Sequence, residues 1–173
     1  LSRTMVGASL LLRVMISLAT ATLGELSAFS QSRLRRILGY SAVADSGYAS
    51  LIGLLSTPSG NSYTDFLLNL MPAEYFILAS CLSIGAAVLL LGLLEKEGVR
   101  EIKDLAGVLA RPNITMLMLA IPLMSVSGIP PLAGFLGKFF VIMYAGGALA
   151  SLGNAGLAVA VALLFLVCSA YIF

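Results

Sequence analysis

The chain alternates between long apolar stretches and short polar connections, a pattern typical of helices that cross a membrane. Five apolar stretches are long enough to do so: 5–30, 37–55, 66–94, 114–150 and 152–173. The fourth is far longer than a single crossing requires, because about 20 apolar residues span the hydrocarbon core. We therefore predict an all-α integral membrane protein with about five transmembrane helices, the fourth of which is interrupted.

Composition agrees with this prediction. Of the 173 residues, 60% are hydrophobic and 10% are charged, whereas soluble domains carry roughly 25% charged residues. The net charge of +2 gives no indication of a nucleic-acid partner, and we expect none. The absence of histidine excludes histidine-based catalysis and histidine metal sites. Cys81 and Cys168 lie in apolar runs, which favours packing residues over a disulfide or a metal pair.

The interruption in the fourth stretch is predicted at Pro122, Gly128, Pro130 and Pro131. Proline lacks an amide N–H and clashes with the carbonyl four residues before it, so a helix should unwind or kink here. Broken backbone at membrane depth is tolerated only inside protein or beside a water-filled cavity. We therefore expect a helix break that faces the interior of the bundle.

Lys138 follows this break within an apolar run. If the helix restarts after Pro131, about 12 apolar or small residues follow the lysine, or roughly 18 Å of helix. This places Lys138 well inside a hydrocarbon core roughly 30 Å thick. Transporters use a broken helix beside a buried ionisable group as an ion site. In the alternative, Lys138 reaches an interface and the prolines form a loop between two short helices.

Two carboxylates also fall within apolar stretches. Glu25 lies about five residues from the polar end of the first stretch and is either buried or interfacial. Asp45 lies near the middle of the second stretch, where an ionisable residue indicates a functional site by default. A structural carboxylate paired with a neighbouring arginine or hydroxyl is the alternative for Asp45.

Basic residues gather in two connections, 31–36 and 95–113, and the polar connection between them at 56–65 has none. The positive-inside rule places both basic connections on the same side of the membrane, two crossings apart. We predict that 95–113 is a short amphipathic helix at the membrane surface. The whole chain, 1–173, is expected to form a single membrane domain.

Two sequence motifs resemble those of a known family. Residues 35–48 (RRILGYSAVADSGY) and 128–139 (GIPPLAGFLGKF) resemble two stretches of the antiporter-like subunits of respiratory complex I. Their form is most similar to NADH dehydrogenase subunit 2. The resemblance runs from about residue 14 to 173 and covers only the C-terminal part of the family pattern, so an upstream broken helix with its own lysine lies outside it.

The resemblance implies a proton-translocating subunit in the membrane arm of NADH:ubiquinone oxidoreductase. Lys138 matches the lysine of the family's second broken helix, which ends a row of buried charges. Asp45 stands where the family usually has histidine, and Glu25 matches no position that the family requires. Lys138, Glu25 and Asp45 are therefore the candidates for proton translocation.

The chain lacks the cysteine clusters and glycine-rich turns that redox cofactors need. We expect no cofactor in this chain and no catalytic activity of its own, so the FMN, iron–sulfur clusters and ubiquinone of such a complex would bind elsewhere. The expected partners are other membrane-arm subunits, membrane lipids and a separate chain that carries the N-terminal part of the same subunit.

The compartment expected from the resemblance is the mitochondrial inner membrane, with a bacterial plasma membrane or a thylakoid as the alternative. Two other functions stay open. One is a subunit of a multi-subunit cation/proton antiporter, which shares these motifs. The other is a structural membrane-arm fragment with no active channel.

Overall fold

A computed structural model describes residues 2–55, 63–96, 98–104 and 114–151. The long elements in these ranges are all α-helices: α1 (Ser2–Phe29), α2 (Leu34–Leu55), α3 (Tyr63–Lys96), α5 (Ile114–Ser127) and α6 (Ala133–Ser151). The all-α class is therefore confirmed. The predicted stretch 152–173 and Cys168 lie outside the described residues.

Two described segments, Leu12–Phe29 and Met71–Lys96, are long and apolar enough to cross a membrane, and α5 is a shorter apolar helix. Of the five predicted crossings, the first and the third thus meet this criterion within the described residues. Their outer faces carry many exposed large apolar side chains, among them Leu82 and Leu89 on α3, at 73% and 75% exposure. A large apolar surface of this kind indicates contact with lipid or with another subunit.

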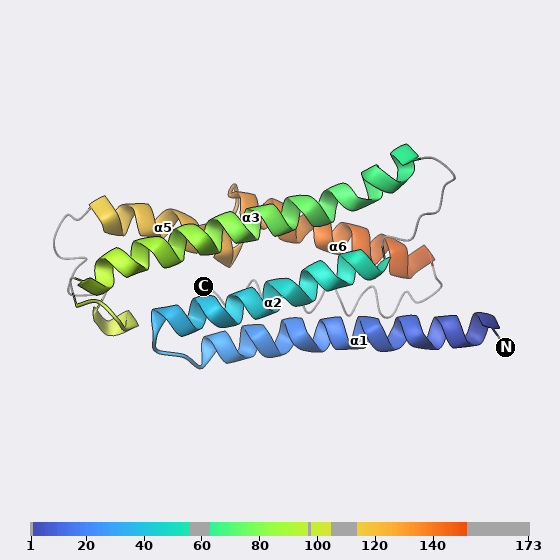
Figure 1. Cartoon of the computed structure of the whole chain (residues 1–173), viewed down its shortest axis with the longest axis horizontal. Coiled ribbons are helices and arrows are strands. Elements are labelled where there is room, and N and C mark those ends of the chain that lie inside the picture. The colour runs from blue at the N-terminus through green and yellow to red at the C-terminus, as the bar shows by residue number, and fades with distance from the viewer. Residues whose placement is uncertain (1, 56–62, 97, 105–113, 152–173) are drawn as a thin grey trace.

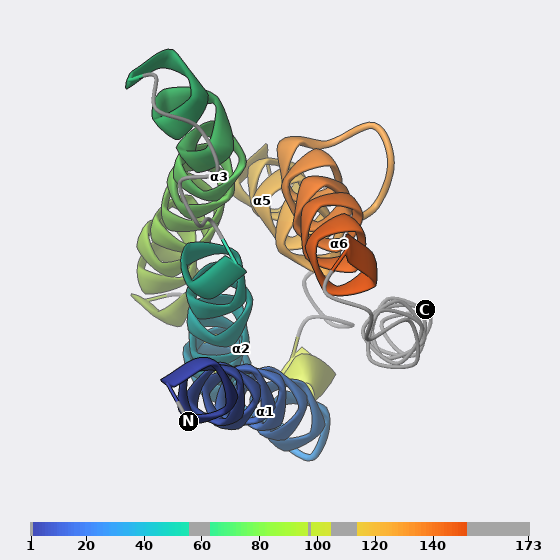
Figure 2. The ribbon, with the colours of Figure 1, turned by 90° about the vertical axis from the view of Figure 1, so that its right-hand side faces the viewer.

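The helices form an elongated bundle (Figures 1 and 2). α2 lies between α1 and α3, and it also contacts α6. α5 and α6 follow one another along α3, so that the interruption between them falls near the middle of the bundle (Figure 1). The break is thus well away from both ends of the bundle.

Small residues allow α1 and α2 to pack closely. A Cβ atom added at Gly24 would lie 2.6 Å from the backbone nitrogen of Ala44, and one added at Gly47 would lie 2.6 Å from that of Ala21. Without side chains at these two positions the backbones can approach closely, as is common between helices in lipid. The abundance of small residues in the first stretch therefore serves helix packing.

Two apolar clusters hold the bundle together. The first joins four helices around Phe76 and contains Ala21, Ala44, Tyr48, Ala73, Phe76 and Val141. The second lies toward the basic end and contains Leu34, Leu38, Ala87, Leu91, Leu94, Val99 and Leu119. Along α3, Ser80 and Ser83 fall between the two clusters. These two hydroxyl residues of α3 thus have apolar packing on both sides along the helix.

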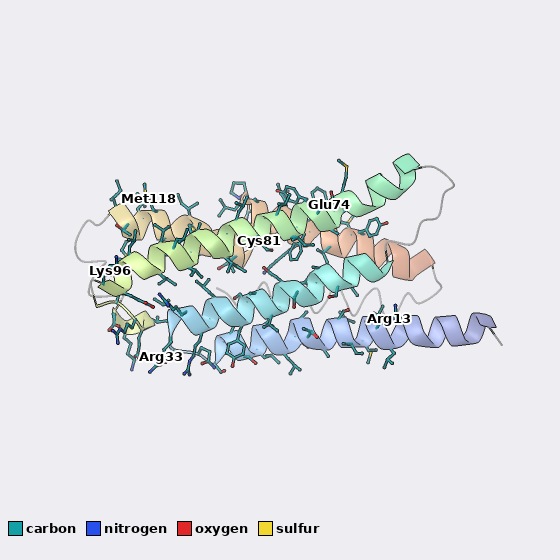
Figure 3. All side chains as sticks on the ribbon, in the orientation of Figure 1. Arg13, Arg33, Glu74, Cys81, Lys96 and Met118 are labelled. Carbon is teal, nitrogen blue, oxygen red and sulfur yellow. The ribbon has the colours of Figure 1, made fainter. Side chains whose placement is uncertain are left out.

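The two basic connections lie at the same end of the bundle. Arg35 Nε lies 2.6 Å from Glu95 Oε1, and the amide of Ile102 donates to the carbonyl of Ser32 at 3.2 Å. Arg33 forms an isolated antiparallel bridge with Glu101. Figure 3 shows Arg33 and Lys96 together at this end, with Arg13 well away from it. The structure therefore agrees with the topology that the positive-inside rule predicts.

The connection after α3 begins later than predicted, because Glu95 and Lys96 are the last residues of that helix. α3 ends in a glycine-based cap. Gly98 has a φ of 95°, and the amide of Val99 donates to the carbonyl of Leu94 at 3.1 Å, as in a Schellman motif. Residues 102–104 are helical, and the rest of the predicted surface helix, 105–113, lies outside the described residues. Hydrogen bonds from the backbone N–H groups of Arg100 and Glu101 lower the pKa of Asp104.

Candidate functional site

The interruption between α5 and α6 is a capped helix end followed by two prolines. Gly128 has a φ of 78°, its amide donates to the carbonyl of Ser125 at 3.0 Å, and the amide of Ile129 donates to that of Met124 at 3.1 Å. These two bonds form a Schellman motif, which glycine favours because it adopts positive φ without strain. Pro130 and Pro131 follow, and α6 begins at Ala133.

Pro122 is not part of the break. We predicted that it interrupts the helix, but it lies inside α5, which continues to Ser127. A proline removes one backbone hydrogen bond, and membrane helices tolerate this where neighbouring helices and local adjustments satisfy the freed carbonyl. α3 contains Pro72 in the same way. The break therefore involves Gly128, Pro130 and Pro131 only.

Lys138 lies in the second turn of α6 and is only 7% exposed. Its Nζ donates a hydrogen bond of 3.0 Å to the carbonyl oxygen of Val126, in the last turn of α5. Carbonyls in the last turn of a helix have no partner within that helix, and they form the negative end of the helix dipole. The ammonium group thus caps α5 from the helix that follows it, which argues against a lysine that reaches an interface.

The two predicted carboxylates lie in the same region, although they come from different helices. Glu25 Oε1 on α1 lies 3.7 Å from Lys138 Nζ, and the Glu25 side chain is 14% exposed. Asp45 on α2 is 8% exposed, interacts electrostatically with Lys138 and is within hydrogen-bonding reach of Ser80 on α3. Glu25 also experiences the charge of Asp45. The structure therefore brings together all three ionisable residues that the sequence singled out.

Two serines at the break were not predicted. Ser125 is buried, its Oγ lies 2.8 Å from Ser83 Oγ on α3, and it accepts a hydrogen bond of 3.2 Å from the amide of Gly134 on α6. The available signal was weak: Ser125 is one of two hydroxyl residues just before Gly128 in an otherwise apolar run. No periodicity of the sequence links it to Ser83.

A cavity of about 510 Å³ lies between α2 and α3 beside Asp45. Ser46 and Ser80 add hydroxyl groups to a wall that is otherwise mostly apolar, formed by side chains such as Ile77 and Ile84. Cys81 also lines the cavity. It is a free thiol on the exposed side of α3 and not a core packing residue, which corrects the prediction for this position.

The ionisable group comprises two carboxylates and one ammonium ion. It lies between helices whose other side chains are largely apolar. If all three are charged, the group carries one excess negative charge. Uptake of a single proton would make it neutral, and a low-dielectric environment favours the neutral state. An arrangement of this kind is chemically able to take up and release a proton.

Comparison with known proteins identifies relatives over nearly the whole chain. Residues 4–168 match the family described as NADH:quinone oxidoreductase/Mrp antiporter, TM. The chain is 29% identical over 149 residues to NADH-quinone oxidoreductase subunit N of Desulfitobacterium hafniense, which covers 81% of this chain and 30% of that protein. It is 37% identical over 134 residues to NAD(P)H-quinone oxidoreductase subunit 2 of the chloroplast of Chlorokybus atmophyticus, which covers 76% and 24%.

Solved structures show the same relationship. A chain of the Mrp complex from Dietzia sp. DQ12-45-1b superposes with a TM-score of 0.70 and 26% identity, covering 94% of this chain and 29% of that one. A chain of respiratory complex I from Thermus thermophilus with bound NADH gives a TM-score of 0.70 and 25% identity, covering 96% and 34%. The chain thus spans about a quarter to a third of the length of these relatives.

Proposed function

The chain belongs to the NADH:quinone oxidoreductase/Mrp antiporter transmembrane family, and on this premise we propose that it translocates protons as a membrane-arm subunit of an NADH:quinone oxidoreductase. The observation that carries the proposal is the burial of Lys138 at a helix break, with Glu25 and Asp45 within electrostatic reach. A buried ionisable cluster at membrane depth is costly to maintain, which supports a functional role for it.

Lys138 is the centre of the proposed mechanism. Its ammonium group has three donors, one of which is engaged by Val126, and Glu25 lies too far for a short hydrogen bond but close enough for strong attraction. A charge that approaches from a neighbouring subunit would change the electrostatic energy of the cluster of Lys138 and the two carboxylates, and so its affinity for a proton. The proton that neutralises the cluster would then be released or taken up.

The helix break supplies the fixed part of this site. The carbonyl of Val126 lies at the negative end of α5 and stabilises the charged form of Lys138. Asp45 borders the cavity of about 510 Å³ between α2 and α3 and so connects the cluster to that space. We therefore assign Lys138 as the central charge of the relay, Glu25 as its direct counter-ion and Asp45 as the carboxylate that links the cluster to the cavity.

In this proposal the chain acts without a cofactor or catalytic activity of its own. The FMN, iron–sulfur clusters and quinone belong to other subunits of the complex. Other membrane-arm subunits, lipids and a separate chain with the N-terminal part of the subunit are the proposed partners. The proposed compartment is the mitochondrial inner membrane, while the named relatives come from bacteria and chloroplasts.

A second candidate is a subunit of an Mrp-type cation/proton antiporter, because the Dietzia Mrp complex matches with the same TM-score as complex I. The two assignments differ in their assembly partners. Mass spectrometry of the intact complex that co-purifies with this chain distinguishes them. Flavin and iron–sulfur subunits support the oxidoreductase, whereas a complex without redox subunits supports the antiporter.

The proposed function is tested with Lys138→Met in the assembled complex, reconstituted into sealed vesicles. Proton uptake and NADH oxidation are recorded together. The proposal predicts that proton uptake per NADH falls while NADH is still oxidised. Unchanged proton uptake in this variant would contradict it.

A further inference from the structure

Ser125 joins three helices at the break, although it carries no charge. It is 6% exposed, its hydroxyl accepts from the amide of Gly134 at 3.2 Å, and it pairs with the hydroxyl of Ser83 at 2.8 Å. A hydroxyl has one donor and two acceptor positions, so it can serve both partners at once. One side chain therefore ties the end of α5 to the start of α6 and to the middle of α3.

The contact between Ser125 and Gly134 lies directly beside the contact between Val126 and Lys138. Ser125 and Val126 are adjacent in α5, while Gly134 and Lys138 are four residues apart in α6 and so share one face of that helix. The amide of Gly134 is in the first turn of α6, where amides have no acceptor within the helix. The two bonds thus form neighbouring links between the same pair of helices.

Gly134 is required for this approach. A Cβ atom at this position would overlap the carbonyl group of Ser125 and would lie 3.1 Å from its Oγ. The absence of a side chain at Gly134 allows the two backbones to come together. The distance between the helices is therefore set at the level of Ser125, one helical turn from Lys138.

Ser83 fixes this link to α3. Ser80, three residues earlier on the same face of α3, is the hydroxyl within reach of Asp45. One face of α3 thus contacts both Ser125, at the break, and Asp45, a carboxylate of the ionisable cluster. A shift of Ser125 relative to α3 would change the position of Lys138 relative to Asp45.

We propose that Ser125 is a positioning residue for Lys138, which docks the first turn of α6 onto the last turn of α5 and is itself anchored by Ser83. The inference rests on the proposed role of Lys138. It concerns where the ammonium group is held, so it can be tested without a measurement of proton transport.

The test uses Ser125→Ala in the intact complex with two readouts: amide hydrogen exchange at Gly134 and the rate at which a membrane-permeant amine reagent modifies Lys138. Loss of the only side-chain acceptor for the Gly134 amide in the described structure should raise its exchange rate about tenfold. Modification of Lys138 should also become several-fold faster. Ser127→Ala is the matched control, because the Ser127 hydroxyl bonds to the Leu123 carbonyl within its own helix.

Ser83→Ala removes only the anchor and should give a smaller rise, which also keeps the test possible if Ser125→Ala fails to assemble. The double variant should resemble Ser125→Ala alone, because residues in direct contact are not additive. Exchange and modification rates that stay at the wild-type level in both single variants would overturn the inference. So would an equal effect of Ser127→Ala. Normal proton transport in Lys138→Met would instead count against the proposed function. It would not bear on the positioning role of Ser125, because the exchange and modification rates are measured in variants that keep Lys138.

Discussion

Lys138 Nζ on α6 and Glu25 Oε1 on α1 lie 3.7 Å apart, both in side chains that are largely withdrawn from the surface. At about 4 Å, two opposite charges attract with roughly 4 kcal/mol at an effective dielectric constant of about 20. The cost of desolvating both groups offsets much of this attraction. The pair therefore adds little net stability. Because each buried charge is stabilised by the other, a change in the protonation of one group changes the protonation of the other, which favours a functional role.

Glu25→Gln should impair the site, because it removes the carboxylate that lies 3.7 Å from Lys138 Nζ and with it one of the two groups that can take up the neutralising proton. Asp45 remains as a second carboxylate near Lys138, so the loss of stability should be smaller than the about 3–5 kcal/mol that removing one partner of an isolated buried ion pair costs in soluble proteins. We expect a lower thermal stability of the assembled complex and fewer protons transported per NADH. Both are measured on the purified complex, the first by thermal denaturation and the second in vesicles.

The control for this variant is Glu74→Gln. Glu74 is an exposed glutamate on α3, and it forms none of the contacts described for the ionisable cluster. The same chemical change there should leave both measurements at the wild-type level. If Glu25→Gln behaves like Glu74→Gln, the ion pair has no functional role.

Gly24→Ala should destabilise the α1–α2 interface. The added Cβ would lie 2.6 Å from the backbone of Ala44, so one of the two helices must move. Overpacking of this kind typically costs about 1–3 kcal/mol. We expect a reduced yield of assembled complex and a lower melting temperature. Gly39→Ala on α2 is the control, because nothing lies within 4 Å of a Cβ there; an equal loss in that variant would show that packing at Gly24 is not the cause.

The effect of a substitution at Gly128 should depend on how well the new residue tolerates a positive φ. Gly128 has a φ of 78°, and a Cβ there would make only an ordinary contact of 3.5 Å with Lys138. The expected penalty is therefore conformational, roughly 1–2 kcal/mol for most residues, and asparagine should be affected less than valine. Proton transport and thermal stability should decrease in the order Gly, Asn, Val. A valine variant equal to the asparagine variant would argue that the backbone conformation at the break is unimportant.

The Arg35–Glu95 pair should contribute little, despite its short distance. The two side chains are 57% and 27% exposed, and exposed ion pairs are typically worth about 0–1 kcal/mol. A double-mutant cycle with Arg35→Ala and Glu95→Ala should give a coupling energy within this range that decreases with added salt. A coupling larger than that between Lys138 and Glu25 would contradict our distinction between the two pairs.

Within the described residues, the sequence alone predicts where the long helices lie, because long apolar runs between short polar connections are visible along the chain. The same holds for the break at Gly128, Pro130 and Pro131, where the backbone chemistry is local. Pro122 shows the limit of such reasoning. A proline inside a helix is tolerated when its neighbours compensate for the lost hydrogen bond, and that depends on packing that the sequence does not display.

The ionisable cluster could be predicted only in part. Lys138, Glu25 and Asp45 stand out individually as charges in apolar stretches. Their proximity depends on how α1, α2 and α6 pack, and no spacing along the chain encodes it. Ser83 and Ser125 were missed for a related reason, because hydroxyl residues are common in membrane helices and only the tertiary structure shows which of them face each other.

The most direct test of the central claim is the number of protons transported per NADH oxidised by the complex carrying Lys138→Met. Lys96→Met, at the exposed end of α3, is the matched control. The account predicts a lower ratio for Lys138→Met, with NADH oxidation retained, and a wild-type ratio for Lys96→Met. A wild-type ratio in both variants would contradict a role for Lys138 in proton translocation.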